Sequence, residues 1–161
     1  MSANKDYNEL VDQVRKVVKQ IADNNFYREF THNHRKIIFH YRGKRVRFTF
    51  ALTPSDRRAT VNDRAKVKRK LRALGITNPR IGMKFMTDMD VSDVLLADLY
   101  SILDKPYEKQ IYYVRNGKEI IYHRYYVSQR RYSGNGRYRE GFFPANKQQY
   151  VDAVNKHNIE N

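Results

Sequence analysis

The chain has 161 residues, no cysteine and a net charge of +15, with a sequence pI near 10. This length corresponds to one domain or two small ones, and no apolar run approaches the roughly 20 residues that a membrane span requires. The lack of cysteine excludes disulfides, zinc ribbons, iron–sulfur clusters and thiol catalysis, and we expect no metal or cofactor. The N-terminus lacks the apolar segment of a secretory signal, so we expect a cytoplasmic protein, or a nuclear one in a cell that has a nucleus.

The basic residues fall into two blocks that an acidic spacer separates. Residues 1–33 are neutral overall, residues 34–75 carry +12, residues 76–108 carry −3 and residues 109–161 carry +6. Positive charge clustered in this way is typical of proteins that hold phosphates, most often those of nucleic acid. The plain alternative is a basic surface that keeps the protein soluble.

The first predicted element is an amphipathic helix over residues 6–23. Its apolar residues recur at helical spacing from Tyr7 to Ile21 and make one apolar face. Asp6, with Glu9 three residues later, is a variant of the capping box that begins helices. A β-hairpin with strands at 35–42 and 45–52 follows, and Gly43-Lys44 lies at its turn.

A basic helix is predicted over residues 54–74, and Gly75 supplies the left-handed residue that ends many helices. Val67 and Leu71 belong to its apolar stripe. We expect its other side to contact phosphates, because so many like charges on one helix repel each other unless an anion lies against them. The expected nucleic-acid-binding residues of this block are Arg45 and Arg47 on the second strand, with Arg57, Arg58, Arg64, Lys68, Arg69 and Arg72 on the helix.

Residues 77–108 are expected to connect two domains, 1–76 and 109–161. This connector contains a short helix near 91–103, and acids gather at its N-terminus, where the helix dipole favours them. These acids are Asp88, Asp90 and Asp93. We interpret them as helix caps rather than metal ligands.

The C-terminal domain predicts the order β-β-β-α. Its elements are strands at 110–115 and 118–127 joined by Asn116-Gly117, a loop at 132–136, a strand at 137–143 and a helix at 146–157 that buries Tyr150, Val151 and Val154. Tyrosines interleave with arginines on this sheet, a pattern that suits contacts to phosphates and bases. The expected binding residues here are Arg115, Arg124, Arg130, Arg131, Arg137 and Arg139.

Residues 34–40, 43–46, 53–59 and 71–76 resemble the small basic phage and prophage proteins with a HicA-type, double-stranded-RNA-binding-domain-like fold. The resemblance implies an α-β-β-(β)-α arrangement over residues 6–76, and the host cytoplasm as location if a phage encodes the chain. In HicA toxins a histidine on the first strand is the catalytic base for RNA cleavage. The matching position is His34, although the glycine that usually precedes this histidine is absent.

The C-terminal part resembles the three-strand-plus-helix DNA-binding domain of plant ethylene-response factors. The resemblance rests on Gly141-Phe142-Phe143 leading into the helix at 146–157. It implies a sheet that contacts DNA. That family usually carries tryptophans on the sheet, and this chain has none.

These observations predict an α+β protein with a basic domain at each end. We expect it to bind nucleic acid without enzymatic activity, with double-stranded DNA favoured over RNA, as a phage-type regulator, architectural factor or host-takeover factor. Two alternatives stay open, a HicA-like ribonuclease that uses His34 and a basic protein that binds an acidic host protein. A homodimer through the acidic segment 88–104 is also open.

Overall fold

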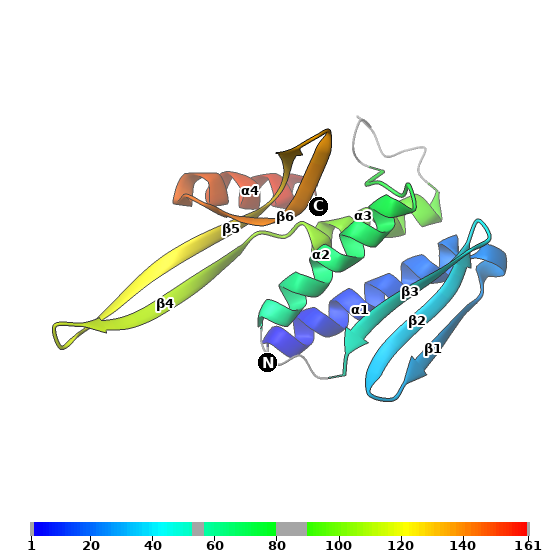
Figure 1. Ribbon diagram of the computed structural model, residues 1–161, viewed down its shortest axis with the longest axis horizontal. Helices are drawn as coiled ribbons and strands as arrows, with labels where there is room; N and C mark the ends of the chain where they lie inside the picture. The colour runs from blue at the N-terminus through cyan, green and yellow to red at the C-terminus, as the bar shows by residue number, and fades with distance from the viewer. Residues whose placement is uncertain (1, 53–56, 80–89, 161) are drawn as a thin grey trace. The chain divides into compact units, whose positions relative to one another are not determined.

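The computed structural model describes residues 2–52, 57–79 and 90–160, and the chain divides into two compact units, Met1–Leu103 and Asp104–Asn161. The first unit combines several helices with a three-stranded antiparallel sheet, and the second combines α4 with another, so the fold class is α+β, as predicted (Figure 1). The first unit contains α1 (Ser2–Ile21), η1 (Asp23–Asn25), β1 (Tyr27–Thr31), β2 (His34–Tyr41), β3 (Lys44–Ala51), α2 (Arg57–Ala73) and α3 (Val91–Leu103). The second contains β4 (Tyr107–Arg115), β5 (Lys118–Gly134), β6 (Arg137–Ala145) and α4 (Lys147–Glu160).

The apolar side of α1 packs against one face of the first sheet and forms the centre of the core. The helix residues at the predicted apolar positions are almost fully buried, namely Tyr7, Leu10, Val11, Val14, Val17 and Val18. They contact the inward residues of β2 and β3, which include Ile37, Phe39, Phe48 and Phe50. The helix begins at Ser2, so Asp6 lies inside it and the capping-box prediction is wrong.

The first sheet has the strand order β1-β2-β3, and β1 is a strand that the sequence pattern did not indicate. Arg42 and Gly43 form the β2–β3 turn, because both adopt the left-handed conformation that a tight hairpin requires. The turn therefore lies one residue earlier than predicted. Its two backbone N–H groups donate to the Asp23 carboxylate at 2.9 and 2.8 Å.

α2 ends at Ala73, one residue before the predicted end, and Gly75 follows it in the predicted left-handed conformation. Gly75 has a φ of +80°, and the Ile76 N–H donates to the Leu71 carbonyl at 2.9 Å, which is the Schellman pattern. The predicted start of this helix at residues 53–56 lies outside the described residues.

The helix predicted within the connector is present as α3, but it belongs to the core of the first unit. Leu96, Leu99 and Leu103 pack in the same cluster as α1, and the Tyr100 hydroxyl donates to the Ile76 carbonyl at 2.8 Å. The unit boundary therefore falls after residue 103 instead of at residues 76 and 108.

The Asp90 carboxylate accepts the Asp93 N–H at 2.8 Å, so Asp90 caps α3 as predicted, and Asp88 lies outside the described residues.

The second unit is organised around the long strand β5. Its first part pairs with β4, its last part pairs with β6, and the two ladders overlap at Tyr125 and Tyr126. The predicted loop at 132–136 is a tight hairpin instead, because β5 continues to Gly134 and the turn is Asn135-Gly136. α4 packs on β5 through Tyr150, whose ring lies 4.9 Å from that of Tyr125.

Val151 on α4 was predicted to be buried, but it is 37 % exposed.

Within the described part of the chain, no helix is long and apolar enough to cross a membrane.

Candidate nucleic-acid interface

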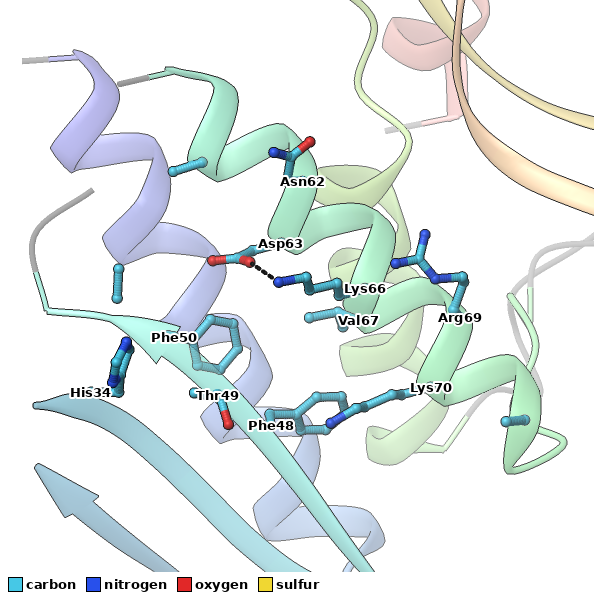
Figure 2. A pocket seen from close by; sticks show the side chains of 13 residues that line it. His34, Phe48, Thr49, Phe50, Asn62, Asp63, Lys66, Val67, Arg69 and Lys70 are labelled. Atoms are coloured by element: carbon cyan, nitrogen blue, oxygen red, sulfur yellow. Dashed lines mark ion pairs between the residues drawn. The ribbon is translucent and has the colours of Figure 1, made fainter. Parts of the chain in front are cut away.

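A groove of about 670 Å³ runs between the edge strand β3 and α2 in the first unit. Figure 2 shows the side chains that line it. Those on α2 include Asn62, Asp63, Lys66, Val67, Arg69 and Lys70, and those on the sheet include His34, Phe48, Thr49 and Phe50. The groove therefore has an apolar floor and three basic side chains along one wall.

Lys70 lies against the rim of β3. Its ammonium group donates to the Arg47 carbonyl and lies 5.6 Å from the centre of the Phe48 ring. Burial lowers the pKa of Lys70, and the positive charges of Arg47 and Lys66 lower it further. Like charges are thus held close together, which is unfavourable in the free protein and favourable once a polyanion lies in the groove.

Asp63 is the acid that lines this groove, and both of its oxygens are engaged. Oδ2 accepts a 2.5 Å hydrogen bond from the Tyr7 hydroxyl, and Oδ1 lies 3.8 Å from the Lys66 ammonium. The same hydroxyl accepts the Ala51 N–H at 2.6 Å. Burial raises the pKa of Tyr7, and its hydrogen bond to Asp63 adds to that effect. The Tyr7 hydroxyl therefore joins α1 to both α2 and β3.

Of the residues predicted on the first basic block, the structure brings His34 and Arg69 into the groove. Arg45 and Arg47 are exposed on β3, and neither has an acidic partner among the described residues. On α2, Lys68 is half-buried and Arg72 is exposed. The side chains of Arg57 and Arg58 lie outside the described set.

Arg64 was assigned to the phosphate side of α2, and this prediction is wrong. It is 6 % exposed and lies on the core-facing side with Thr60 and Val67. The physical reason is helical geometry, since a residue three positions before Val67 is only about 60° from it around the helix. Arg64 is therefore part of the packing of the first unit.

Sequence reasoning missed Lys66 and Lys70, which line the groove. The spacing held a signal for both. Lys66 follows Asp63 by three residues, which places the two side chains side by side on a helix. Lys70 follows Val67 by three residues, so it borders the apolar stripe and projects beside the sheet that this stripe covers.

In the second unit, β4 and the first part of β5 form a two-stranded ribbon with one basic face. Lys109 lies opposite Arg124, and Arg115 lies opposite Lys118. Apolar residues occupy the rows between them, Ile111 with Tyr122 and Tyr113 with Ile120. Like charges directly opposite each other destabilise a sheet. The predicted nucleic-acid-binding residues did not include Lys109 or Lys118.

The acids of the ribbon lie on its other face. Glu119 is paired with Val114 there, and the Glu108 carboxylate contacts the His123 imidazole. The Arg124 guanidinium lies 5.7 Å from the centre of the Tyr122 ring, on the basic face. We call the face that carries Lys109, Arg115, Lys118 and Arg124 the basic ribbon face.

The other predicted arginines of this unit do not all join that face. Arg131 lies an odd number of residues from Arg124 on β5, and alternation places it on the opposite face, 4.2 Å from the centre of the Phe143 ring. Arg137 is exposed at the start of β6. Arg130 pairs with Glu140 and Arg139 with Arg131 in the ladder, while the side chains of Arg130 and Arg139 are not described.

Comparisons of this chain with protein-family models, curated proteins and solved structures found no match. The resemblances to HicA-type proteins and to ethylene-response factors therefore stay predictions. Within the described residues, no group of three or more acidic or histidine side chains could hold a metal ion.

Proposed function

We propose that this protein binds double-stranded DNA without cleaving it, and that the β3–α2 groove holds the phosphate backbone. The observation that carries the proposal is the row of Lys66, Arg69 and Lys70 along one wall of the groove. The three cations lie within about one turn of each other on the same helix. Such a row suits phosphates that a duplex holds at fixed spacing, and phosphate contacts supply most of the affinity of such complexes.

The surroundings of the groove support a polyanion as the partner. Arg45 and Arg47 extend the positive charge along β3, beyond the groove itself. Asp63 offsets one of the three cations that line the groove, so a net positive charge remains there. The basic ribbon face of the second unit supplies a further acid-free surface of the shape that enters a major groove.

RNA cleavage is the second candidate, because His34 lines the same groove. A ribonuclease that works in this way needs the imidazole and a further group that titrates or stabilises the scissile phosphate. Asp63 is the acid at hand, and its oxygens are already engaged. We therefore propose that His34 contacts phosphate rather than acting as a catalytic base.

Fluorescence anisotropy with a labelled DNA duplex over a range of salt concentrations tests this proposal. Six to eight phosphate contacts give a slope of log affinity against log salt of about −5 to −7. The Lys66→Ala/Arg69→Ala/Lys70→Ala variant should bind at least about tenfold more weakly, with a slope shallower by about 3. Cleavage is monitored in the same samples with labelled RNA.

The matched control removes the same charge from exposed positions on α1, as Lys5→Ala/Lys16→Ala/Lys19→Ala. This variant should lose only the general attraction between a basic protein and DNA. A wild-type slope shallower than about −2 would contradict the proposal, because it would mean that the charge is not used on a polyanion. Equal losses in the two triple variants would also contradict it, because the groove would then have no special role.

A further inference from the structure

The outer face of the first sheet carries exposed aromatic residues. α1 packs on the inner face, so alternation along the strands places the even-numbered residues of β1 and β2 on the outer face. Phe26, in extended conformation just before β1, is 63 % exposed, and Phe30 on β1 is 44 % exposed. Continuing the β1–β2 register by one residue places Phe26 opposite His40.

Basic residues surround the two phenylalanines. The Arg28 guanidinium lies 5.0 Å from the centre of the Phe30 ring. Lys36 lies opposite Phe30 on β2, and Arg47 lies in the same row as Arg28 and Ile38. Arg45 lies opposite His40, so cations follow the face from one edge strand to the other.

No acid from the three strands lies on this outer face. Glu29, the acid of these strands, alternates to the inner side, where it lies opposite Ile37. There its carboxylate accepts hydrogen bonds from the Arg15 guanidinium at 2.6 and 3.0 Å. A face that is merely solvated usually mixes charges of both signs. The outer sheet face carries only positive charges, and this composition indicates an anionic partner.

We propose that this outer sheet face binds single-stranded DNA, with bases stacked on Phe26 and Phe30 and phosphates held by Arg28, Lys36, Arg45 and Arg47. A duplex hides the faces of its bases, so exposed rings beside cations suit a strand whose bases are free to stack. The two rings are four residues apart, about 13 Å along the strand, and each accepts a separate base. The choice of DNA rests on the proposed function of the groove.

The probe is a labelled oligothymidylate of about 12 nucleotides, within the site sizes of known single-strand binders, and an abasic strand of equal length is its partner. The oligothymidylate should bind at least about tenfold more tightly, because it alone offers bases for stacking. Equal affinities would overturn the proposal, since charge would then account for the binding. An oligouridylate that binds tenfold or more tightly than the oligothymidylate would overturn the assignment to DNA.

Ring-preserving and ring-removing variants separate stacking from general hydrophobic contact. Phe26→Leu/Phe30→Leu should weaken oligothymidylate binding at least about tenfold, and Phe26→Tyr/Phe30→Tyr should retain it. The matched control is Val91→Ala/Val94→Ala, which removes exposed apolar side chains from α3. Unchanged thermal unfolding confirms that the variants fold. Wild-type affinity in the leucine variant, or an equal loss in the α3 control, would contradict the proposal.

This site and the groove can fail separately. The groove variant Lys66→Ala/Arg69→Ala/Lys70→Ala should lose duplex binding and keep most of the oligothymidylate binding, and the leucine variant should show the reverse. Suppose that the wild-type protein does not bind duplex DNA but binds oligothymidylate more tightly than the abasic strand. This result would contradict the function proposed for the groove and support the sheet site. Duplex binding together with equal affinities for oligothymidylate and the abasic strand would support the groove and contradict the sheet site.

Discussion

The Tyr7 hydroxyl donates a 2.5 Å hydrogen bond to the Asp63 carboxylate, and this contact joins the first helix of the chain to the basic helix α2. The same hydroxyl accepts the Ala51 N–H at the end of β3. One buried side chain therefore fixes both walls of the groove to the core. The position of α2, which carries the groove cations, relative to β3 therefore depends on this contact, although Tyr7 itself is buried away from the surface.

Tyr7→Phe should lower the free energy of unfolding by about 1–3 kcal/mol, because a partly buried acceptor on Asp63 and the Ala51 N–H both lose their partner. Urea denaturation measures the change. Tyr41→Phe is the control, since no hydrogen bond of its hydroxyl is present among the described residues, and a change within about 0.5 kcal/mol is expected. Equal effects of the two substitutions would show that the Tyr7–Asp63 bond has no special weight.

Duplex affinity should begin to fall with rising pH before the ordinary titration range of lysine is reached. Burial and the neighbouring positive charges lower the pKa of Lys70, so this side chain loses its charge earlier than an ordinary lysine. Lys70→Arg keeps the charge and should flatten the profile, whereas Lys66→Arg should leave the fall in place. Anisotropy titrations at constant ionic strength measure the profiles, and identical profiles for the two variants would contradict the role of Lys70.

Arg64→Ala should reduce stability rather than affinity. Arg64 is 6 % exposed, and its stem packs in the first unit, so truncation costs about 1–3 kcal/mol of packing. Arg69→Ala should do the reverse, because Arg69 is exposed and lines the groove. Thermal unfolding and duplex binding are measured on both variants. A larger loss of affinity in Arg64→Ala than in Arg69→Ala would restore the original assignment of Arg64 to phosphate contact.

Arg124→Ala should change which DNA sequences are preferred, while changes in the α2 cations should weaken all duplexes alike. Arg124 lies on the basic ribbon face, and a two-stranded ribbon can reach base edges in a major groove. The sequence pattern predicts the same change in preference for Arg137→Ala and Arg139→Ala. Binding selection from a randomised duplex pool measures the preference. Equal losses on every sequence would rule out base contact by this sheet.

His34→Ala should weaken duplex binding by less than about 1 kcal/mol, as expected for one exposed polar contact. The wild-type protein should leave labelled RNA intact. RNA that is cut by the wild type and intact with His34→Ala would make the ribonuclease the better interpretation. A fresh preparation treated with a general nuclease inhibitor separates this activity from contamination.

Local signals made much of the fold predictable. The apolar spacing in α1 and α3 and the Asn116-Gly117 turn depend on neighbouring residues, and the structure confirms each. β1 could not be found in this way, because Tyr27 is its one partly buried residue and the strand exists through pairing with β2. The place of α3 in the core also depends on its contacts with α1, a helix that is far from α3 in the sequence.

The candidate site was predictable in charge but not in geometry. The net charge of residues 34–75 indicated a phosphate-binding surface, and Arg69 lies in the groove. The wall that β3 adds, and with it the importance of Lys70, follows from the packing of a strand beside a helix. Arg42 as the first turn residue was missed because non-glycine residues seldom adopt a positive φ.

The β4–β5 ribbon loses its third strand where β6 ends, opposite Tyr125. From there to the turn at Asn116, each strand has one hydrogen-bonded neighbour, and most side chains on both faces are exposed. A two-stranded hairpin is marginally stable in water, so its amide hydrogens should exchange through local opening while the part of the sheet beneath α4 stays closed. If adding a binding partner slows amide exchange only in this ribbon, the ribbon is where that partner binds.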